Sequence, residues 1–506
     1  MNGSSSVHFH SLYNPKKEAE RFVANSLKDK KPGVIIVIGP GENYIKDVLD
    51  TSFSYAKKYY IQPCSLFDTI SINQAFYWSP ASSIPLKDFL HQIVYDEFSA
   101  AGIAVLEWEP VTRYFAQESN VIRNELAKVL AATASEKATI AYWSKRWLIN
   151  SIKFSSGARN VFSLNSLDKP IAILAAGPGL SDYINFIKAN KNKLFIICIA
   201  SALPAILEHD IYPDAVFLSD PGYWNTFHTR LIKRAQIPII MPPSARIPTD
   251  LFSQEFFVVN TNLIFERFAI QAIGCPSYYA KAFGTSVGTA LDFALHITNN
   301  RVLIFGFDLA SYDIVSHVIP YSFLTLSLQN SSRLTPFYAR QFSEVTEQFP
   351  ETINAWRFSR SFNTYAQELP VSDESCTRII RFSKSPMIKQ YENLAVITKD
   401  FDTYDFSFLN YVSNEVYITK NVYQNSISIK TLLQKFFAEA IQKLQNNTSF
   451  GLTYDEILFF KALSIKKFNE TFALAIRNEL KQETINHFIE ASSEALSAIL
   501  SRYCSD

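Results

Sequence analysis

Short apolar runs alternate with longer polar or helix-like segments along most of the chain. Each run suits a strand that is buried on both faces, and many segments between the runs have the apolar period of a helix. Strands that alternate with helices are typical of a doubly wound, parallel α/β sheet. The predicted strands are residues 34–38, 102–110, 171–174, 194–199, 215–218, 237–241, 256–259 and 302–305.

The same plan of strand, turn and helix begins twice. The run 34–38 is followed by Gly39-Pro40-Gly41 and a helical pattern, and the run 171–174 is followed by Gly177-Pro178-Gly179 and another. A degenerate internal repeat has this form. The sequence therefore predicts two separate α/β units.

Breaks in the pattern divide the 506 residues, which are too many for one ordinary core. We predict an α/β fold with a doubly wound Rossmann-like centre, flanked by an N-terminal α/β domain and a C-terminal helical domain. The predicted segments are the N-terminal domain over 1–165, the central domain over 166–320, an irregular insertion or lid over 321–420 and the helical domain over 421–506. The irregular segment mixes Phe, Tyr, Arg and Ser with no clear period, which a plain surface segment does as well as a lid.

The C-terminal segment has the period of amphipathic helices. Apolar residues recur at three- and four-residue spacing from Ile429 to Leu444. Thr453 and Glu456 match a capping box at the start of the next helix. This pattern suits a packing or partner-binding module better than a site of chemistry.

Composition excludes several classes of protein. A hydrophobic fraction of 48%, with 41 Phe and 25 Tyr, favours packed cores over disorder. The 48 Lys and Arg balance 47 Asp and Glu, so no overall field attracts nucleic acid or an anionic membrane. Five scattered cysteines without CxxC spacing argue against a disulfide framework or a Cys-rich zinc site. No signal-peptide pattern and no apolar run near ~20 residues is found, so we expect a cytoplasmic protein without a membrane span.

Two glycine-rich loops are candidates for phosphate binding. Glycines between a strand and a helix, as in Gly177-Pro178-Gly179, let backbone N–H groups approach a phosphate, although many such turns use glycine only for geometry. The second loop has Gly284, Thr285 and Ser286 at a helix start, which suits a phosphate or a sugar and equally an ordinary N-cap. Neither loop has GxGxxG or P-loop spacing.

Polar residues after two of the predicted strands are candidates for catalysis. Asp220 precedes Pro221-Gly222 and could bind a ribose or a metal, or form a simple Asx-turn. Asp308 follows Gly306 at the end of the run 302–305, and two carboxylates at neighbouring strand ends could share a divalent cation, although no ligand cluster in the sequence demands one. His317 has the pKa range of a general acid or base, although a lone histidine is more often structural.

Four segments of the central region together resemble the central domain of the Maf (motility-associated factor) proteins, over about residues 170–320. They read ILAAGPGLSD, ASALPAILEHDIYPDAVFLSDPG, GTSVGTALDFAL and LIFGFDLASYDIVSH. Maf proteins are bacterial flagellin glycosyltransferases, and they share this domain with archaeal 6-hydroxymethylpterin pyrophosphokinases. Gly179 stands where the family loop has Ser.

The resemblance implies transfer of a nonulosonic acid of the pseudaminic or legionaminic type. The donor would be a CMP-sugar, the acceptor a Ser or Thr of flagellin, and the outcome flagellar assembly and motility. By the same resemblance, the catalytic residues would be His317 and Asp308. The substrate and nucleotide contacts would be Gly177, Pro178, Gly179, Ser201, Asp220, Gly284, Thr285, Ser286 and Ser316.

We hypothesise an inverting transfer in which His317 or Asp308 takes the proton of the acceptor hydroxyl. No cofactor is required, because CMP leaves with a single phosphate. Two alternatives remain open. A pterin pyrophosphokinase would transfer diphosphate from ATP with Mg²⁺ on Asp220 and Asp308. A flagellin-binding protein without catalytic activity would use the aromatic surface and the C-terminal helices.

Overall fold

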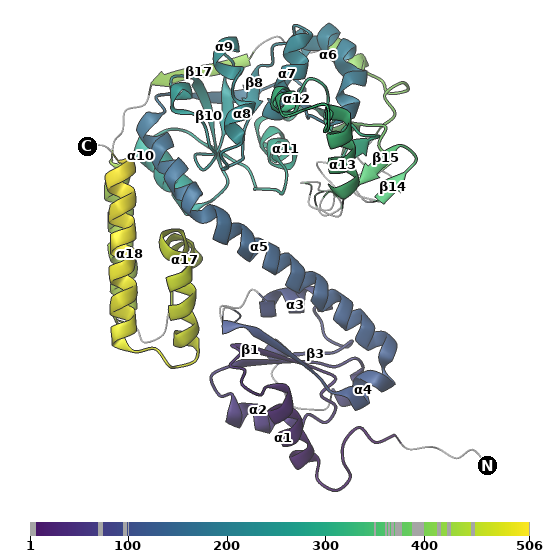
Figure 1. Cartoon of the computed structure of the whole chain (residues 1–506), viewed down its shortest axis with the longest axis vertical. Coiled ribbons are helices and arrows are strands. Elements are labelled where there is room, and N and C mark those ends of the chain that lie inside the picture. The colour runs from purple at the N-terminus through teal and green to yellow at the C-terminus, as the bar shows by residue number, and fades with distance from the viewer. Residues whose placement is uncertain are drawn as a thin grey trace, which may run out of the picture. The chain divides into compact units, whose positions relative to one another are not determined.

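The computed structural model describes residues 7–68, 74–94, 99, 101–348, 351–359, 362, 365, 369, 377–386, 399–411, 416–422, 427–446 and 451–504. The chain forms two compact units. The first combines residues 1–145 with 436–498, and the second combines 146–435 with 499–506. Figure 1 shows the elements of both units.

The first unit contains a parallel sheet with the strand order β3-β2-β1-β4. Its strands are β1 (Val34–Ile38), β2 (Lys57–Ile61), β3 (Tyr77–Trp78) and β4 (Ile103–Glu107). The helices of its N-terminal part are α1 (Pro15–Ser26), α2 (Ile45–Ser52), α3 (Leu86–Val94), α4 (Glu109–Tyr114) and the start of α5 (Ala116–Gly157). Helices α1 and α2 bury one face of the sheet, and α3 with α5 buries the other.

The C-terminal helices are α16 (Ile429–Asn446), α17 (Tyr454–Ile476) and α18 (Gln482–Tyr503). Most of their length belongs to the first unit. The expected capping box is present, because Thr453 Oγ1 accepts the N–H of Glu456 and Glu456 accepts the N–H of Thr453. The predicted helical C-terminal region is confirmed.

The second unit contains a large sheet with the order β16-β12-β6-β7-β8-β9-β10-β5-β17, and β11 also pairs with β10. All neighbours are parallel except β17, which runs antiparallel to β5. The strands are β5 (Asn160–Leu167), β6 (Ile171–Leu174), β7 (Phe195–Ile199), β8 (Ala215–Phe217), β9 (Ile239–Met241), β10 (Glu255–Asn260), β11 (Tyr278–Tyr279), β12 (Val302–Phe305), β16 (Ile379–Phe382) and β17 (Val416–Val422).

Helices cover both faces of this sheet. Successive residues of β6 point to opposite cores, so Ile173 packs into one and Leu174 into the other. The helices are α6 (Ile184–Asn190), α7 (Leu203–Glu208), α8 (Asn225–His228), α9 (Ile232–Ala235), α10 (Ile264–Ile273), α11 (Ser286–Ile297), α12 (Leu324–Gln329) and α13 (Phe337–Gln348). A small antiparallel sheet adds β13 (Ser311–Tyr312), β14 (Glu351–Ile353) and β15 (Trp356–Phe358).

The predicted α/β class, with parallel sheets and a helical C-terminus, is confirmed, and the bounds of the predicted segments stay a prediction. The C-terminal helices pack mostly with the N-terminal α/β part, and α5 continues past residue 145 into the second unit. Within 321–420 the described residues include α12, α13 and the sheet strands β16 and β17. That region is therefore partly built into the second unit.

Candidate functional site

The carboxyl ends of β6, β7, β8 and β12 are the natural place for a ligand in the second unit. From β6 the chain adds β7 to β10 on one side, and it returns to place β12 on the other side of β6. The strand order therefore reverses between β6 and β12. Open α/β sheets bind ligands at such a switch point, beyond the carboxyl ends of the strands.

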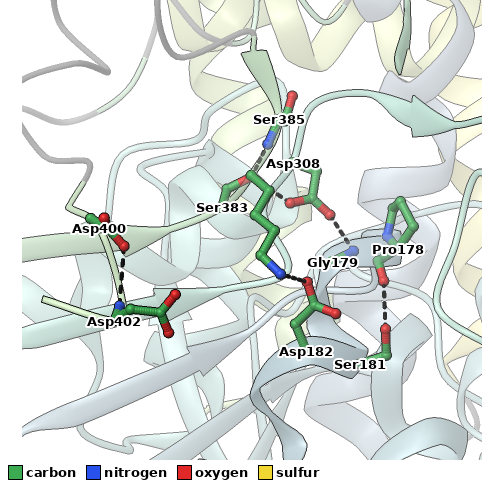
Figure 2. A network of polar contacts seen from close by, with 10 residues as sticks. Pro178, Gly179, Ser181, Asp182, Asp308, Ser383, Ser385, Asp400 and Asp402 are labelled. Atoms are coloured by element: carbon green, nitrogen blue, oxygen red, sulfur yellow. Dashed lines mark hydrogen bonds and ion pairs between the residues drawn. The ribbon is translucent and has the colours of Figure 1, made fainter. Parts of the chain in front are cut away.

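Asp308 ties the first glycine loop to the end of β12. Its carboxylate accepts the N–H of Gly179 at 2.7 Å and the hydroxyl of Ser383 at 2.6 Å, as Figure 2 shows. The side chain is 1% exposed, and burial raises the pKa of Asp308. The N–H of Gly179 is therefore directed at a carboxylate of the protein itself.

Close packing explains the glycines of this loop. A Cβ on Gly177 would lie 2.3 Å from the carbonyl oxygen of Gly306 and 2.4 Å from Oδ2 of Asp308. A Cβ on Gly179 would lie 2.9 Å from Oδ1 of Asp308. Pro178 begins a short 3₁₀ helix, Pro178–Tyr183. In the structure, the glycines of this turn thus serve close packing, which is the alternative to phosphate binding.

A buried cation lies near Asp308. Arg381 in β16 is fully buried, and its Nε donates to the carbonyl of Phe307 at 2.6 Å. Burial lowers the pKa of Arg381 to about 10, and the charge of Asp308 opposes that shift. Asp308 is consequently part of a buried network that positions the loop.

His317 is oriented differently from Asp308. The residue as a whole is exposed, while its ring stacks on Tyr321 with centroids 5.3 Å apart and has Nδ1 2.9 Å from Oγ of Ser316. The N–H of Val318 donates to the carbonyl of Ala176, which fixes this segment to the end of β6. Neighbouring protein atoms lower the pKa of His317 through desolvation. Desolvation therefore favours the neutral form of the imidazole.

Asp220 forms the Asx-turn that its sequence context allows. Its Oδ1 accepts the N–H of Gly222 at 2.6 Å. It follows β8, whereas Asp308 follows β12, and β6 and β7 lie between these strands. Three strand spacings place the two strand ends about 14 Å apart. The two carboxylates therefore do not lie at neighbouring strand ends, which the possible shared cation required.

His228 is a second histidine of the site, and the sequence analysis missed it. It ends α8, its ring lies edge-on to Phe323 at 4.9 Å, and its Nδ1 is buried without a hydrogen-bond partner. Burial lowers the pKa of His228 to about 4, while Asp220 raises it and His317 lowers it further. These couplings bring Asp220, His228 and His317 into one neighbourhood.

The second glycine loop acts as a helix cap. Thr285 Oγ1 accepts the N–H of Gly288 at 3.0 Å at the start of α11, and Gly284 precedes this cap. Ser286 Oγ lies 2.7 Å from Oγ of Ser219, which follows β8. The hydroxyl pair joins the end of β8 to the N-terminus of α11, and both ends face the edge where a ligand would bind.

The last of the predicted nucleotide contacts is Ser201. Ser201 lies in a short 3₁₀ helix, Ala200–Ala202, directly after β7 and is partly buried. Ser383 and His228 lie outside the four quoted segments, whereas Ser219 lies in the second of them beside Asp220 but was not singled out. Among the residues that the structure describes, no three His, Cys, Asp or Glu side chains are grouped to hold a metal ion. In the described part of the chain, no helix is both long and apolar enough to cross a bilayer.

Comparison with known proteins shows what the second unit resembles. Residues 145–313 match the family model described as 6-hydroxymethylpterin diphosphokinase MptE-like. The chain thus contains an MptE-like domain, and the expected resemblance of its central region is confirmed. An uncharacterized protein of Treponema pallidum (strain Nichols) is 26% identical over 317 residues, which is 60% of this chain and 68% of the relative.

A solved structure is similar over nearly the whole chain. It is the Maf glycosyltransferase from Magnetospirillum magneticum AMB-1, with a TM-score of 0.44 and 12% identity over 99% of this chain and 84% of that chain. A likeness at this level does not by itself establish a shared activity.

Proposed function

We propose that the protein is a glycosyltransferase that moves a nonulosonic acid from a CMP-sugar to a Ser or Thr hydroxyl of flagellin. The observation that carries the proposal is His317. It is a solvent-exposed residue at the switch-point edge, its ring contacts Ser316 and Tyr321, and desolvation lowers its pKa. A general base for a hydroxyl acceptor needs this combination of access and fixed orientation.

The reaction can be written with the groups at this edge. With Nδ1 of His317 occupied by Ser316, Nε2 is the nitrogen left to take the acceptor proton. The acceptor oxygen then bonds to the anomeric carbon of the donor as the bond from that carbon to the CMP phosphate breaks. The negative charge that develops on the departing phosphate is best stabilised by donors already in place.

The N-terminus of α11 is the best candidate for that phosphate. The helix has 12 residues, begins after Thr285 and presents the Ser219 and Ser286 hydroxyls. Helix N-termini attract anions through free N–H groups and partial positive charge. The Gly177 loop is a weaker candidate, because the Gly179 N–H already donates to Asp308.

Diphosphate transfer to a pterin is the second candidate, because the matched family model carries that description. The reaction would need Mg²⁺ bound by open carboxylates. Asp308 is buried against Gly179 and Ser383, and Asp220 lies three strands away. The geometry therefore favours glycosyl transfer over the kinase.

Calorimetry with CMP and with ATP, each with and without Mg²⁺, separates the candidates. The proposal predicts metal-independent CMP binding that Ser286→Ala weakens. Mg²⁺-dependent ATP binding without CMP binding would support the pterin kinase, and binding of neither would support a flagellin-binding protein without activity.

A transfer assay tests the base. His317→Asn should keep CMP binding and lose flagellin modification by at least about a hundredfold, the usual contribution of a positioned base. His487→Ala, at an exposed position of α18 in the first unit, is the matched control and should retain full activity. Unchanged modification by His317→Asn would remove His317 from the mechanism.

A further inference from the structure

The first unit has a switch point of its own. The chain passes from β1 to β2 and β3 on one side, and β4 lies on the other side of β1. The segments that flank this switch point are the loop 39–44 after β1 and the first turn of α4 with its N-cap, residues 108–112. A Cβ on Gly39 would meet Thr112 at 2.9 Å, so the two segments touch.

Residues 7–14, the N-terminal arm, cross this edge before α1 begins. Trp108 Nε1 donates to the carbonyl of Phe9 at 2.7 Å. The ring of Phe9 packs against Phe67, Tyr114 and Phe115. The arm is therefore held in place by specific contacts.

His10 of the arm lies between these two segments. Its ring stacks on Trp108, with centroids 5.2 Å apart and planes at 24°, and lies edge-on to Tyr44 at 5.0 Å. Its Nε2 accepts the N–H of Glu42 at 3.0 Å. A Cβ on Gly41 would lie 2.5 Å from that nitrogen, so glycine makes room for the ring.

Polar groups buried at the same edge lack partners. Gln62, directly after β2, is 0% exposed, and its Oε1 has no hydrogen bond although its Nε2 donates to the Gly41 carbonyl. Asn43, in the loop with Gly41, is 6% exposed, and neither atom of its amide has a partner. Buried polar atoms are nearly always paired, so unpaired ones at a sheet edge point to a ligand.

We propose that this edge is a second ligand site, for a planar nitrogen heterocycle of the nucleobase type, and that His10 occupies it in the structure. The His10 ring shows what the site accepts: a flat aromatic ring stacked on Trp108, with a ring nitrogen that accepts the Glu42 N–H. A nucleobase has both features and a larger stacking surface than imidazole. The site lies wholly in the first unit and does not depend on the proposed transferase activity of the second.

Competition between the arm and a ligand makes the proposal testable. Docked His10 lowers the apparent affinity of any ring that needs the same place, in proportion to the fraction of docked arm. A ring stack and a hydrogen bond to the backbone together favour docking by about tenfold or more. Removing the His10 ring should therefore raise nucleoside affinity by about tenfold.

The experiment titrates the full-length protein with adenosine, guanosine, cytidine and uridine, using calorimetry and tryptophan fluorescence. His10→Ser should bind at least one nucleoside about tenfold more tightly than the wild type. Tyr13→Ser, which removes an aromatic ring that is 99% exposed on the same arm, should bind like the wild type. Adding Gly41→Ala to His10→Ser should abolish the gain, because the new methyl group fills the ring position.

A measurement on the wild type covers the case in which His10→Ser fails to fold. In spectra of histidine-labelled protein, saturating nucleoside should shift the His10 ring signals towards those of a solvated histidine. The proposal is overturned if folded His10→Ser binds none of the nucleosides at millimolar concentration, or if a nucleoside binds while the His10 signals stay unchanged.

Discussion

Replacing Gly177 with alanine tests the packing of the Asp308 loop. Gly177 has a φ of −66°, which alanine adopts without strain, so any effect must come from contacts of the new methyl group. That carbon would lie 2.3 Å from the Gly306 carbonyl oxygen and 2.4 Å from Asp308 Oδ2. Both distances are roughly 1 Å short of ordinary contact.

The cost follows from what must move. The Gly306 oxygen belongs to the backbone and accepts the N–H of Gly177 at 2.8 Å, so relief of the clash breaks that bond and disturbs the bond from Gly179 to Asp308. Overpacking costs about 1–3 kcal/mol and each lost hydrogen bond about 1 kcal/mol. We expect Gly177→Ala to destabilise the second unit by about 3–5 kcal/mol.

Gly179→Ala is the graded control. The three atoms nearest to its methyl group would all belong to the carboxylate of Asp308, at 2.9 Å and beyond, and a side chain can give way more easily than backbone. We expect a loss of about 1–2 kcal/mol. Urea unfolding with hydrogen exchange can assign each loss to the second unit. Equal stability of Gly177→Ala and the wild type would refute the packing argument and leave the glycines free for a ligand.

Three further predictions concern pH and capping. Glu266 accepts hydrogen bonds from Ser244 and Thr261, and burial raises its pKa from 4.5 to about 7. Between these pH values the folded state therefore binds a proton that the unfolded state releases. Stability should therefore fall by about 3 kcal/mol as pH rises from about 4.5 to 7, and Glu266→Gln should flatten this part of a urea-midpoint profile. Burial lowers the pKa of His10 despite the nearby carboxylates of Glu42 and Glu18, so docking of the arm should weaken below about pH 6.5. At that pH the wild type should bind nucleosides more tightly, whereas the affinity of His10→Ser should not change. Thr453→Ala should cost about 1 kcal/mol in urea unfolding by removing one half of the capping box, and an effect below 0.3 kcal/mol would contradict that role.

The sequence predicted those strands best that are buried on both faces. The bounds of β1, β6 and β12 match the apolar runs 34–38, 171–174 and 302–305, because a strand covered by helices on each side has no polar face to interrupt the run. Strand β2 begins with the partly buried Lys57 and Lys58, and β16 contains the buried Arg381. Charges inside these short strands hid them from a reading of apolar runs.

The polar partners in the candidate site could not be predicted from the sequence for another reason. Asp308 was singled out by its place after β12, but its partner Ser383 is 75 residues away and follows a strand that was itself missed. His228 belongs to the site only because α8 folds back so that its ring meets Phe323. A motif can identify a residue at a strand end, whereas its partner depends on the tertiary fold.

The two Gly-Pro-Gly turns show how far a motif alone can mislead. In the first unit Gly39 and Gly41 have φ values of +67° and +60°, which favour glycine by conformation. In the second unit Gly177 has φ −66°, and glycine is needed there because Gly306 and Asp308 come too close for a side chain. In both units the turn lies at a switch point and is covered by the protein itself, by His10 in one and by Asp308 in the other. His10 is a partly exposed residue on a terminal arm, whereas Asp308 is buried in a network with Ser383 and Arg381. Only His10 can be displaced from its turn at low cost. A ligand that contacts a Gly-Pro-Gly turn directly is therefore expected in the first unit.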